Sequence, residues 1–128
     1  MTTAILLIAH GSRRPEANAD LQQAAALLRP SVQPVLVETA YLELAEPSIP
    51  AGLQRCIDQG ATSIRLLPYF LSAGSHVTRD LERFRREFAA AHPDCDCRLC
   101  PPLGLHAGVI AALVDRSREE LPPPADEA

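Results

Sequence analysis

Residues 4–15 of the chain, AILLIAHGSRRP, decide its fold class because they join a buried strand to a polar turn and a helix start. The residues before His10 are small or apolar, which indicates a buried strand, and Pro15 suits the first turn of a helix. In a parallel α/β sheet, ligands bind outside the carboxyl ends of the strands, so His10 stands where such a fold does its chemistry. The alternative is a histidine that only caps a turn. The next residues offer a close backbone approach and hydrogen-bond donors: Gly11, Ser12, Arg13 and Arg14.

Length and composition are those of one ordinary globular domain. The chain has 128 residues, of which 47% are hydrophobic and 22% charged. No apolar run reaches the roughly 20 residues that span a bilayer, and the start lacks the basic segment and cleavage site of a signal peptide. We therefore expect a cytoplasmic protein with no role in a membrane.

The charge balance is acidic, with a formal net charge of −4, although all 12 basic residues are arginine. An acidic domain is a poor candidate for a nucleic-acid partner. Arginine offers a planar fork to carboxylates, so the pair Arg13-Arg14 suits an anionic ligand. The second cluster, Arg83, Arg85 and Arg86, is interpreted as a solvated helix face.

Four cysteines occur in the chain, and we interpret all of them as reduced thiols without a ligand role. Cys56 falls at a helical core position. Cys95, Cys97 and Cys100 lack the second pair that zinc sites use and do not match an iron–sulfur run. Strand alternation places Cys95 and Cys97 on one face and Cys100 on the other. Metal handling by this cluster is the alternative.

Hydrophobic periodicity predicts four alternating strands and helices. Such an order with short connections is typical of a single-domain α/β fold, a parallel sheet of about four strands flanked by helices on both faces. We expect this domain to cover residues 1–121 and an acidic, disordered tail to cover 122–128. The predicted strands are 4–9, 34–42, 63–70 and 95–100, and the predicted helices begin near Pro15, Ser48, Val77 and His106.

Three details of the helices are predicted from helix-breaking and helix-capping residues and from the spacing of apolar residues. Pro30 is expected to stop the first helix, and Ser48 to cap the second. The last helix, residues 106–121, is expected to turn its apolar residues inward: Val109, Ile110, Leu113 and Val114.

Two histidines follow strands that should be neighbours. His10 ends the first strand, and His76 lies in the loop after the third, so both imidazoles should reach one cleft at the carboxyl edge. Two neutral imidazoles suit a borderline divalent metal such as Co, Ni, Fe or Zn, and they leave other coordination positions open. Taken singly, each histidine has a structural alternative. His106 begins the last helix near this edge and is a weaker candidate for the site. His92, directly before Pro93, is interpreted as a residue that ends a helix.

Other catalytic patterns are missing from the sequence. It contains neither of the glycine-rich nucleotide motifs and no nucleophile elbow. A histidine phosphatase usually carries arginine directly before its strand-ending His-Gly, and Ala9 occupies that place here. The phosphatase interpretation therefore ranks last among the alternatives.

Four stretches resemble the small sirohydrochlorin chelatases of the CbiX type, of the class II chelatase family and related to the ferrochelatase fold. The third is the most specific, because its Phe-Leu-x-x-Gly-x-His-x-x-x-Asp pattern is long and unusual in composition. Ala107 departs mildly from the pattern, in which proline is common. The stretches, in the expected order, are residues 8–13 (IAHGSR), 42–49 (LELAEPSI), 68–80 (PYFLSAGSHVTRD) and 102–106 (PLGLH).

This resemblance implies an enzyme, a lyase-class chelatase that inserts a divalent metal into sirohydrochlorin, a tetrapyrrole with eight carboxylates. It implies His10 as proton acceptor and metal ligand and His76 as second ligand. Glu46 and the loop of Leu71, Ser72, Ala73, Gly74 and Ser75 would hold the macrocycle. Further candidates are Ser12, Arg13, Glu43 and His106.

The implied partners are sirohydrochlorin, the metal ion as substrate, and a second copy of the chain in a homodimer, with no organic cofactor. Cobalt, for cobalamin-type synthesis, is favoured over iron, for sirohaem, and nickel. The alternative from another class is a carrier of tetrapyrrole or metal that uses the same histidines without turnover.

Overall fold

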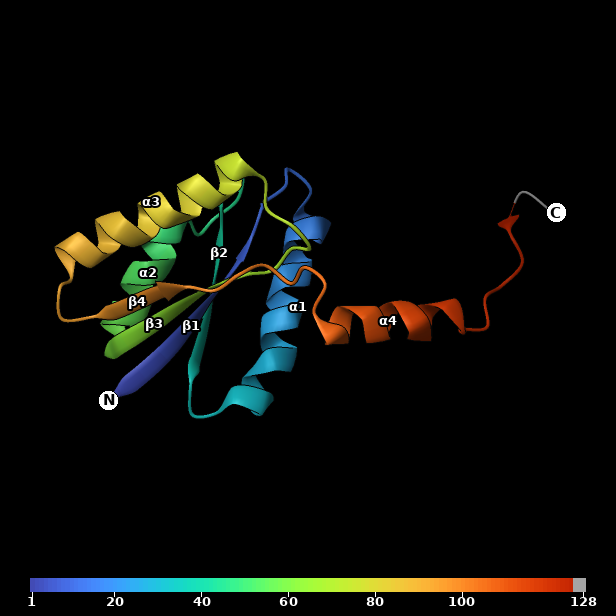
Figure 1. The fold of residues 1–128 in the computed structure, drawn as a ribbon, viewed down its shortest axis with the longest axis horizontal. Coiled ribbons are helices and arrows are strands. Elements are labelled where there is room, and N and C mark those ends of the chain that lie inside the picture. Colours follow the sequence, from blue (N-terminus) through green and yellow to red (C-terminus); the bar gives the residue numbers. More distant parts are fainter. Residues whose placement is uncertain (126–128) are drawn as a thin grey trace.

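The computed structural model describes residues 1–125 and confirms the predicted α/β architecture (Figure 1). All strand pairs are parallel, and the sheet order is β2-β1-β3-β4. No helix of the described residues is long and apolar enough to cross a membrane. The elements are β1 (Thr2–Ala9), α1 (Pro15–Val32), β2 (Leu36–Tyr41), α2 (Ile49–Asp58), β3 (Ala61–Pro68), α3 (Ser75–Ala91), β4 (Asp96–Leu99) and α4 (Ala107–Ser117).

The core has two layers, one on each face of the sheet. Leu6 and Ile8 of β1 face a cluster with Leu53 of α2 and Leu81 of α3, all with at most 2% exposure. Leu7 points the other way and packs with α1 through Leu21. Successive side chains of a strand alternate between faces, so β1 supplies both layers and must lie inside the sheet.

The topology makes neighbours of the two strands that precede the candidate histidines. β1 pairs with β3 up to Ile8 and Pro68, so the strands that precede His10 and His76 are neighbours, as predicted. Pro68 is the last residue of β3, where its missing N–H costs the ladder least. Ser48 caps α2 as expected, with its Oγ accepting from the Ala51 N–H at 3.3 Å.

The prediction that Pro30 stops the first helix is wrong. α1 continues through Pro30 to Val32. Proline removes one backbone hydrogen bond, but it lies in the last turn, and Val32 beyond it packs against the α1 layer of the core. Tertiary packing of the final residues therefore outweighs the local breaker.

The predicted inward face of the last helix is also wrong. α4 projects away from the sheet (Figure 1), and none of its residues is buried. Ile110 is 43% exposed, Leu113 61% and Val114 39%, while Val109 is half-buried. Of the tail predicted for residues 122–128, the described part, 122–125, is exposed, and 126–128 lie outside the described residues.

The predicted core position of Cys56 is confirmed, and two further cysteines are buried with it. All four are free, and Cys56, Cys95 and Cys97 belong to the core layer beneath α2 and α3. Burial raises the pKa of Cys56 to about 12 and that of Cys97 to about 11, and it raises the pKa of Cys95 as well. Cys100 is half-buried just after β4.

We expect Cys100 to react first with a disulfide reagent under native conditions at pH 8, with the other three thiols reacting only after unfolding. In the folded state the Cys56 and Cys97 thiols lose their protons at a higher pH than an ordinary thiol, whose pKa is 9.0. Unfolding free energy should therefore fall as pH rises from about 9 toward 11–12. Thiol counting and urea titrations check both points, and rapid native reaction of three thiols would contradict them.

Candidate functional site

Three loops converge where β1, β2 and β3 end. The Leu42 N–H donates to Ala9 O at 2.9 Å, and the Glu43 N–H donates to His10 O at 3.0 Å. On the other side of β1, the Tyr69 N–H donates to Ile8 O at 2.7 Å. These backbone bonds extend the parallel ladders past the strands and hold the loops after β2 and β3 against the His10 loop.

Gly11 is required by this convergence. Its φ is +93°, and a Cβ added to it would lie 1.7 Å from the carbonyl oxygen of Glu43. Any side chain at this position would force the loop after β2 away from His10. The close approach expected of Gly11 is therefore made to the protein's own backbone.

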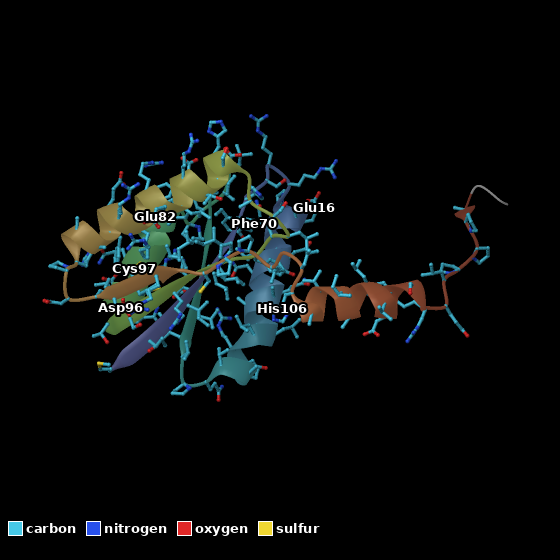
Figure 2. The ribbon with its side chains drawn as sticks, in the orientation of Figure 1. Glu16, Phe70, Glu82, Asp96, Cys97 and His106 are labelled. Carbon is cyan, nitrogen blue, oxygen red and sulfur yellow. The ribbon has the colours of Figure 1, made fainter. Side chains whose placement is uncertain are left out.

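The His10 side chain is exposed, and its ring lies against Phe70. The two ring centroids are 4.5 Å apart, with 32° between the planes. Figure 2 places Phe70 at the carboxyl edge of the sheet. Within residues 1–125 the His10 imidazole makes no hydrogen bond, so both nitrogens are available to a proton or a metal.

Ser12 is fixed by a residue that the sequence did not single out. Asn18 accepts from the Ser12 N–H at 2.9 Å and donates to Ser12 O at 2.7 Å. Tyr41, 3% exposed, donates its hydroxyl to Asn18 O at 2.5 Å. A polar side chain in a first helical turn commonly bonds back to the preceding turn, which was the signal available in the sequence.

The loop after β2 carries Glu43 and Glu46, which are both exposed. It is closed by the Tyr41 N–H, which donates to Pro47 O at 2.8 Å. Leu44 between the two acids is 56% exposed and has a φ of +63°, a conformation that an apolar side chain rarely adopts. Glu46 lines an open depression of about 490 Å³ together with Ser12, Arg13, Asn18 and Tyr41.

The loop of Leu71, Ser72, Ala73, Gly74 and Ser75 leads into α3. All but half-buried Ala73 are exposed, and Leu71 is 61% exposed. A Cβ at Gly74 would meet nothing within 4 Å, so the fold does not itself require glycine there. His76 is the second residue of α3 and is exposed, and its side chain makes no hydrogen bond to residues 1–125.

His106 is a capping residue in this structure. It is the N-cap of α4, and its Nδ1 accepts from the Gly108 N–H at 2.9 Å. Figure 2 shows it at the start of α4, apart from Phe70. The structural alternative therefore accounts for this histidine.

The site contains no closed metal cage. Within the described residues no group of three or more histidine, cysteine or acidic side chains is arranged to hold a metal ion. The remaining candidates are two imidazoles without hydrogen bonds to the described residues: His10 directly follows β1, and His76 lies in the first turn of α3, after the loop that follows β3. Such a pair fits an open, exchangeable site better than a structural one, which usually has four ligands.

The parallel sheet, with its polar loops gathered at one edge, is an α/β domain with the fold of solved chelatase structures. The family model named CbiX matches residues 4–120. The chain belongs to the CbiX family.

The structural neighbours have the same fold. A CbiX protein from Marinobacter aquaeolei superposes with a TM-score of 0.77 and 29% identity, over 91% of this chain and 94% of that one. The sirohydrochlorin chelatase SirB from Bacillus subtilis in complex with cobalt gives a TM-score of 0.84 and 30% identity, over 92% of this chain and 50% of SirB.

Curated relatives are similar in sequence but longer. A sirohydrochlorin cobaltochelatase of Priestia megaterium is 31% identical over 93% of this chain and 39% of its own length. A sirohydrochlorin ferrochelatase of Bacillus subtilis is 32% identical over 93% of this chain and 46% of its length. The chain thus spans less than half of either relative.

Replacing Gly11 with alanine should lower the unfolding free energy by about 3 kcal/mol or more, because backbone strain and a clash with Glu43 O act together. Gly60→Ala is the matched control. Gly60 has a φ of +90°, but an added Cβ there meets nothing within 4 Å. Gly60→Ala should lower the unfolding free energy by only about 1 kcal/mol. Urea denaturation measures both, and equal losses would contradict the role of the close approach.

Proposed function

We propose that this protein is a sirohydrochlorin metallochelatase that inserts a divalent metal ion into the tetrapyrrole. This proposal rests on the pair of exposed imidazoles, His10 and His76, which follow the neighbouring strands β1 and β3 along the chain. Family membership supports the reaction class, since the similar proteins named above are cobalto- and ferrochelatases.

The proposed roles follow from imidazole chemistry. Metallation removes two pyrrole protons while the metal sheds its own ligands. His10 accepts a proton and contacts the metal, and His76 is the second ligand. Two imidazoles hold the ion without closing its coordination sphere, so four ring nitrogens can take it over. The Phe70 ring supports the His10 ring through a tilted ring contact.

Positive groups at the same edge suit a substrate with eight carboxylates. Arg13 and Arg14 precede α1, and Arg79 lies in the first turns of α3. All three are exposed, and none forms an ion pair within residues 1–125. In contrast, Arg83, Arg85 and Arg86 pair with acids of their own helix. Arg83 and Arg86 are exposed, as the solvated-face interpretation expects, whereas Arg85 is half-buried and also donates to Cys97 O at 3.3 Å. The amino ends of α1 and α3 add positive potential.

Around the macrocycle, we assign Glu46 and the loop of residues 71–75 to contacts with the substrate. Ser72 and Ser75 are exposed donors for its carboxylates, and the open space above Gly74 admits a flat ring. Glu43, tied by its backbone to His10, is a reserve proton acceptor. Cobalt is the proposed physiological metal, with iron next. The protein is also proposed to act as a homodimer.

Replacing His10 or His76 with alanine should lower the rate of metallation at least 100-fold, because each removes a metal ligand and His10 also a proton acceptor. The assay follows the macrocycle bands of sirohydrochlorin anaerobically, with Co²⁺, Fe²⁺ and Ni²⁺ offered separately. His92→Gln is the control, because His92 stacks on Phe88 at the end of α3, away from the strand ends.

Full activity of either alanine variant would refute the two-histidine site. If the wild-type protein binds sirohydrochlorin but does not accelerate the insertion of any of the three metals, the carrier hypothesis is favoured. Hydrolysis of phosphate esters, with no effect of metal on sirohydrochlorin, would favour the phosphatase.

Replacing Arg13 and Arg79 together with glutamine should raise the KM for sirohydrochlorin about tenfold and leave kcat nearly unchanged, because these side chains bind carboxylates remote from the metal. The wild-type KM should rise with salt, and that of the double variant should rise less. Arg55→Gln, on α2, is the matched control. An unchanged KM would remove the arginines from the substrate site.

A further inference from the structure

Leu44 combines two features that a folded domain rarely places in one residue. Its φ of +63° lies in the left-handed region, and its side chain is 56% exposed. That region strains the backbone of a residue with a branched apolar side chain, whereas glycine and asparagine adopt it readily. Leu44 belongs to neither core cluster, although Leu42 and Ala45 each pack against one. Burial in the domain therefore does not offset the strain at Leu44.

The conformation of Leu44 follows from the contacts of the residue before it. The Glu43 N–H donates to His10 O at 3.0 Å, and the Glu43 carbonyl oxygen occupies the space where a Cβ of Gly11 would lie. The peptide groups of Glu43 are thus committed to the His10 loop, and the chain has to turn at the next residue. Glycine or asparagine would make this turn with less strain. The fold explains the backbone of Leu44 and leaves its leucine side chain unexplained.

The Leu44 side chain lines the open depression of about 490 Å³ beside the candidate site. The lining combines charged groups, Arg13 and Glu46, with apolar ones, which include Ala19 and Ala45 as well as Leu44. Sites for small organic ligands are commonly built in this way, from apolar side chains with a few polar groups that fix orientation. The mixture suits a ligand that has an apolar ring and charged substituents.

A second exposed leucine lies on the opposite side of the His10 loop. β1 lies between β2 and β3, so the loops that follow those two strands flank His10. Leu44 is in the loop after β2, and Leu71, which is 61% exposed, is in the loop after β3. Backbone hydrogen bonds tie both loops to β1 and to the His10 loop, so the positions of the two leucines relative to His10 are fixed.

We infer that Leu44 is a substrate-binding residue that packs on the flat face of the tetrapyrrole. This inference rests on the proposed function and adds an apolar contact to the charged ones, so that the site recognises the conjugated ring as well as its carboxylates. Glycine and asparagine suit the backbone better at this position, but they offer no apolar surface to a ring. A strained backbone held in place at a binding site is consistent with such a role.

The first measurement is the affinity for metal-free sirohydrochlorin, by anaerobic absorbance titration, together with urea denaturation of each variant. Leu44→Gly and Leu44→Asn should each weaken binding about tenfold, because part of a leucine side chain is no longer buried by the ligand. Their urea midpoints should equal or exceed that of the wild type, because the backbone strain is relieved.

Two control variants accompany this measurement. Leu44→Met keeps an apolar side chain of similar volume and should bind sirohydrochlorin within about twofold of the wild type. Leu27→Ala removes the side chain of an 80% exposed leucine on α1 and should leave the affinity unchanged. Tight binding by Leu44→Met and weak binding by Leu44→Asn would together assign the effect to apolar contact.

The second measurement separates this apolar role from the ionic role of the arginines. The loss of affinity in Leu44→Gly should be the same at low and high salt, whereas the loss in the Arg13 and Arg79 double variant should shrink as salt screens the charges. In the metallation assay, Leu44→Gly should raise the KM for sirohydrochlorin about tenfold and leave kcat within about twofold of the wild type.

Three results overturn the inference while leaving the proposed function intact. The first is a Leu44→Gly variant that binds sirohydrochlorin as tightly as the wild type. The second is a joint loss of affinity and stability, which shows a structural role. The third is a lower molar mass than the wild type in light scattering at equal concentration, which assigns Leu44 to a contact between copies of the chain. A wild type that does not bind sirohydrochlorin overturns the proposed function, and the inference with it.

Discussion

The approach of the Glu43 carbonyl to Gly11 is the constraint on which the candidate site depends. The two loops meet so closely that a Cβ would lie 1.7 Å from the oxygen, and the neighbouring His10 O accepts the Glu43 N–H. This contact fixes the direction in which the chain leaves β1. Asn18 and Tyr41 then hold the following turn from α1 and β2. The depression beside Arg13 and Glu46 exists because these bonds set its walls.

The sheet and its helices could be predicted from local signals. Runs such as residues 4–9, the serine cap before α2 and the apolar spacing of α3 each act over a few residues, and local and tertiary preferences agree there. The adjacency of β1 and β3 followed from general rules of parallel sheets. The contact of Phe70 with His10 could not be predicted in this way. The two rings follow separate strands, and they meet only because of the register in which β1 and β3 pair.

Both errors in the helices arise where tertiary structure overrides a local rule. Pro30 is a breaker by its chemistry, yet Val32 beyond it finds a place on the core and carries the helix on. For α4 the amphipathic pattern was detected correctly, but the helix does not turn its apolar stripe to its own sheet. Periodicity identifies an apolar stripe, and it does not fix the direction in which the helix leaves the domain. The direction of α4 is set by hydrogen bonds of residues 103 and 104 to the loop after β3, which no sequence pattern encodes.

The way the loops are held also bears on the proposed chemistry. The bonds that anchor the His10 loop run through backbone atoms and Asn18, so they leave the imidazole nitrogens free. A metal that must pass to a macrocycle cannot sit in a closed cage, because four protein ligands would compete with four ring nitrogens. A rigid backbone that presents two unengaged imidazoles would meet both requirements of the proposed reaction: the ligands would stay in place between turnovers, and the ion would be bound weakly enough to leave.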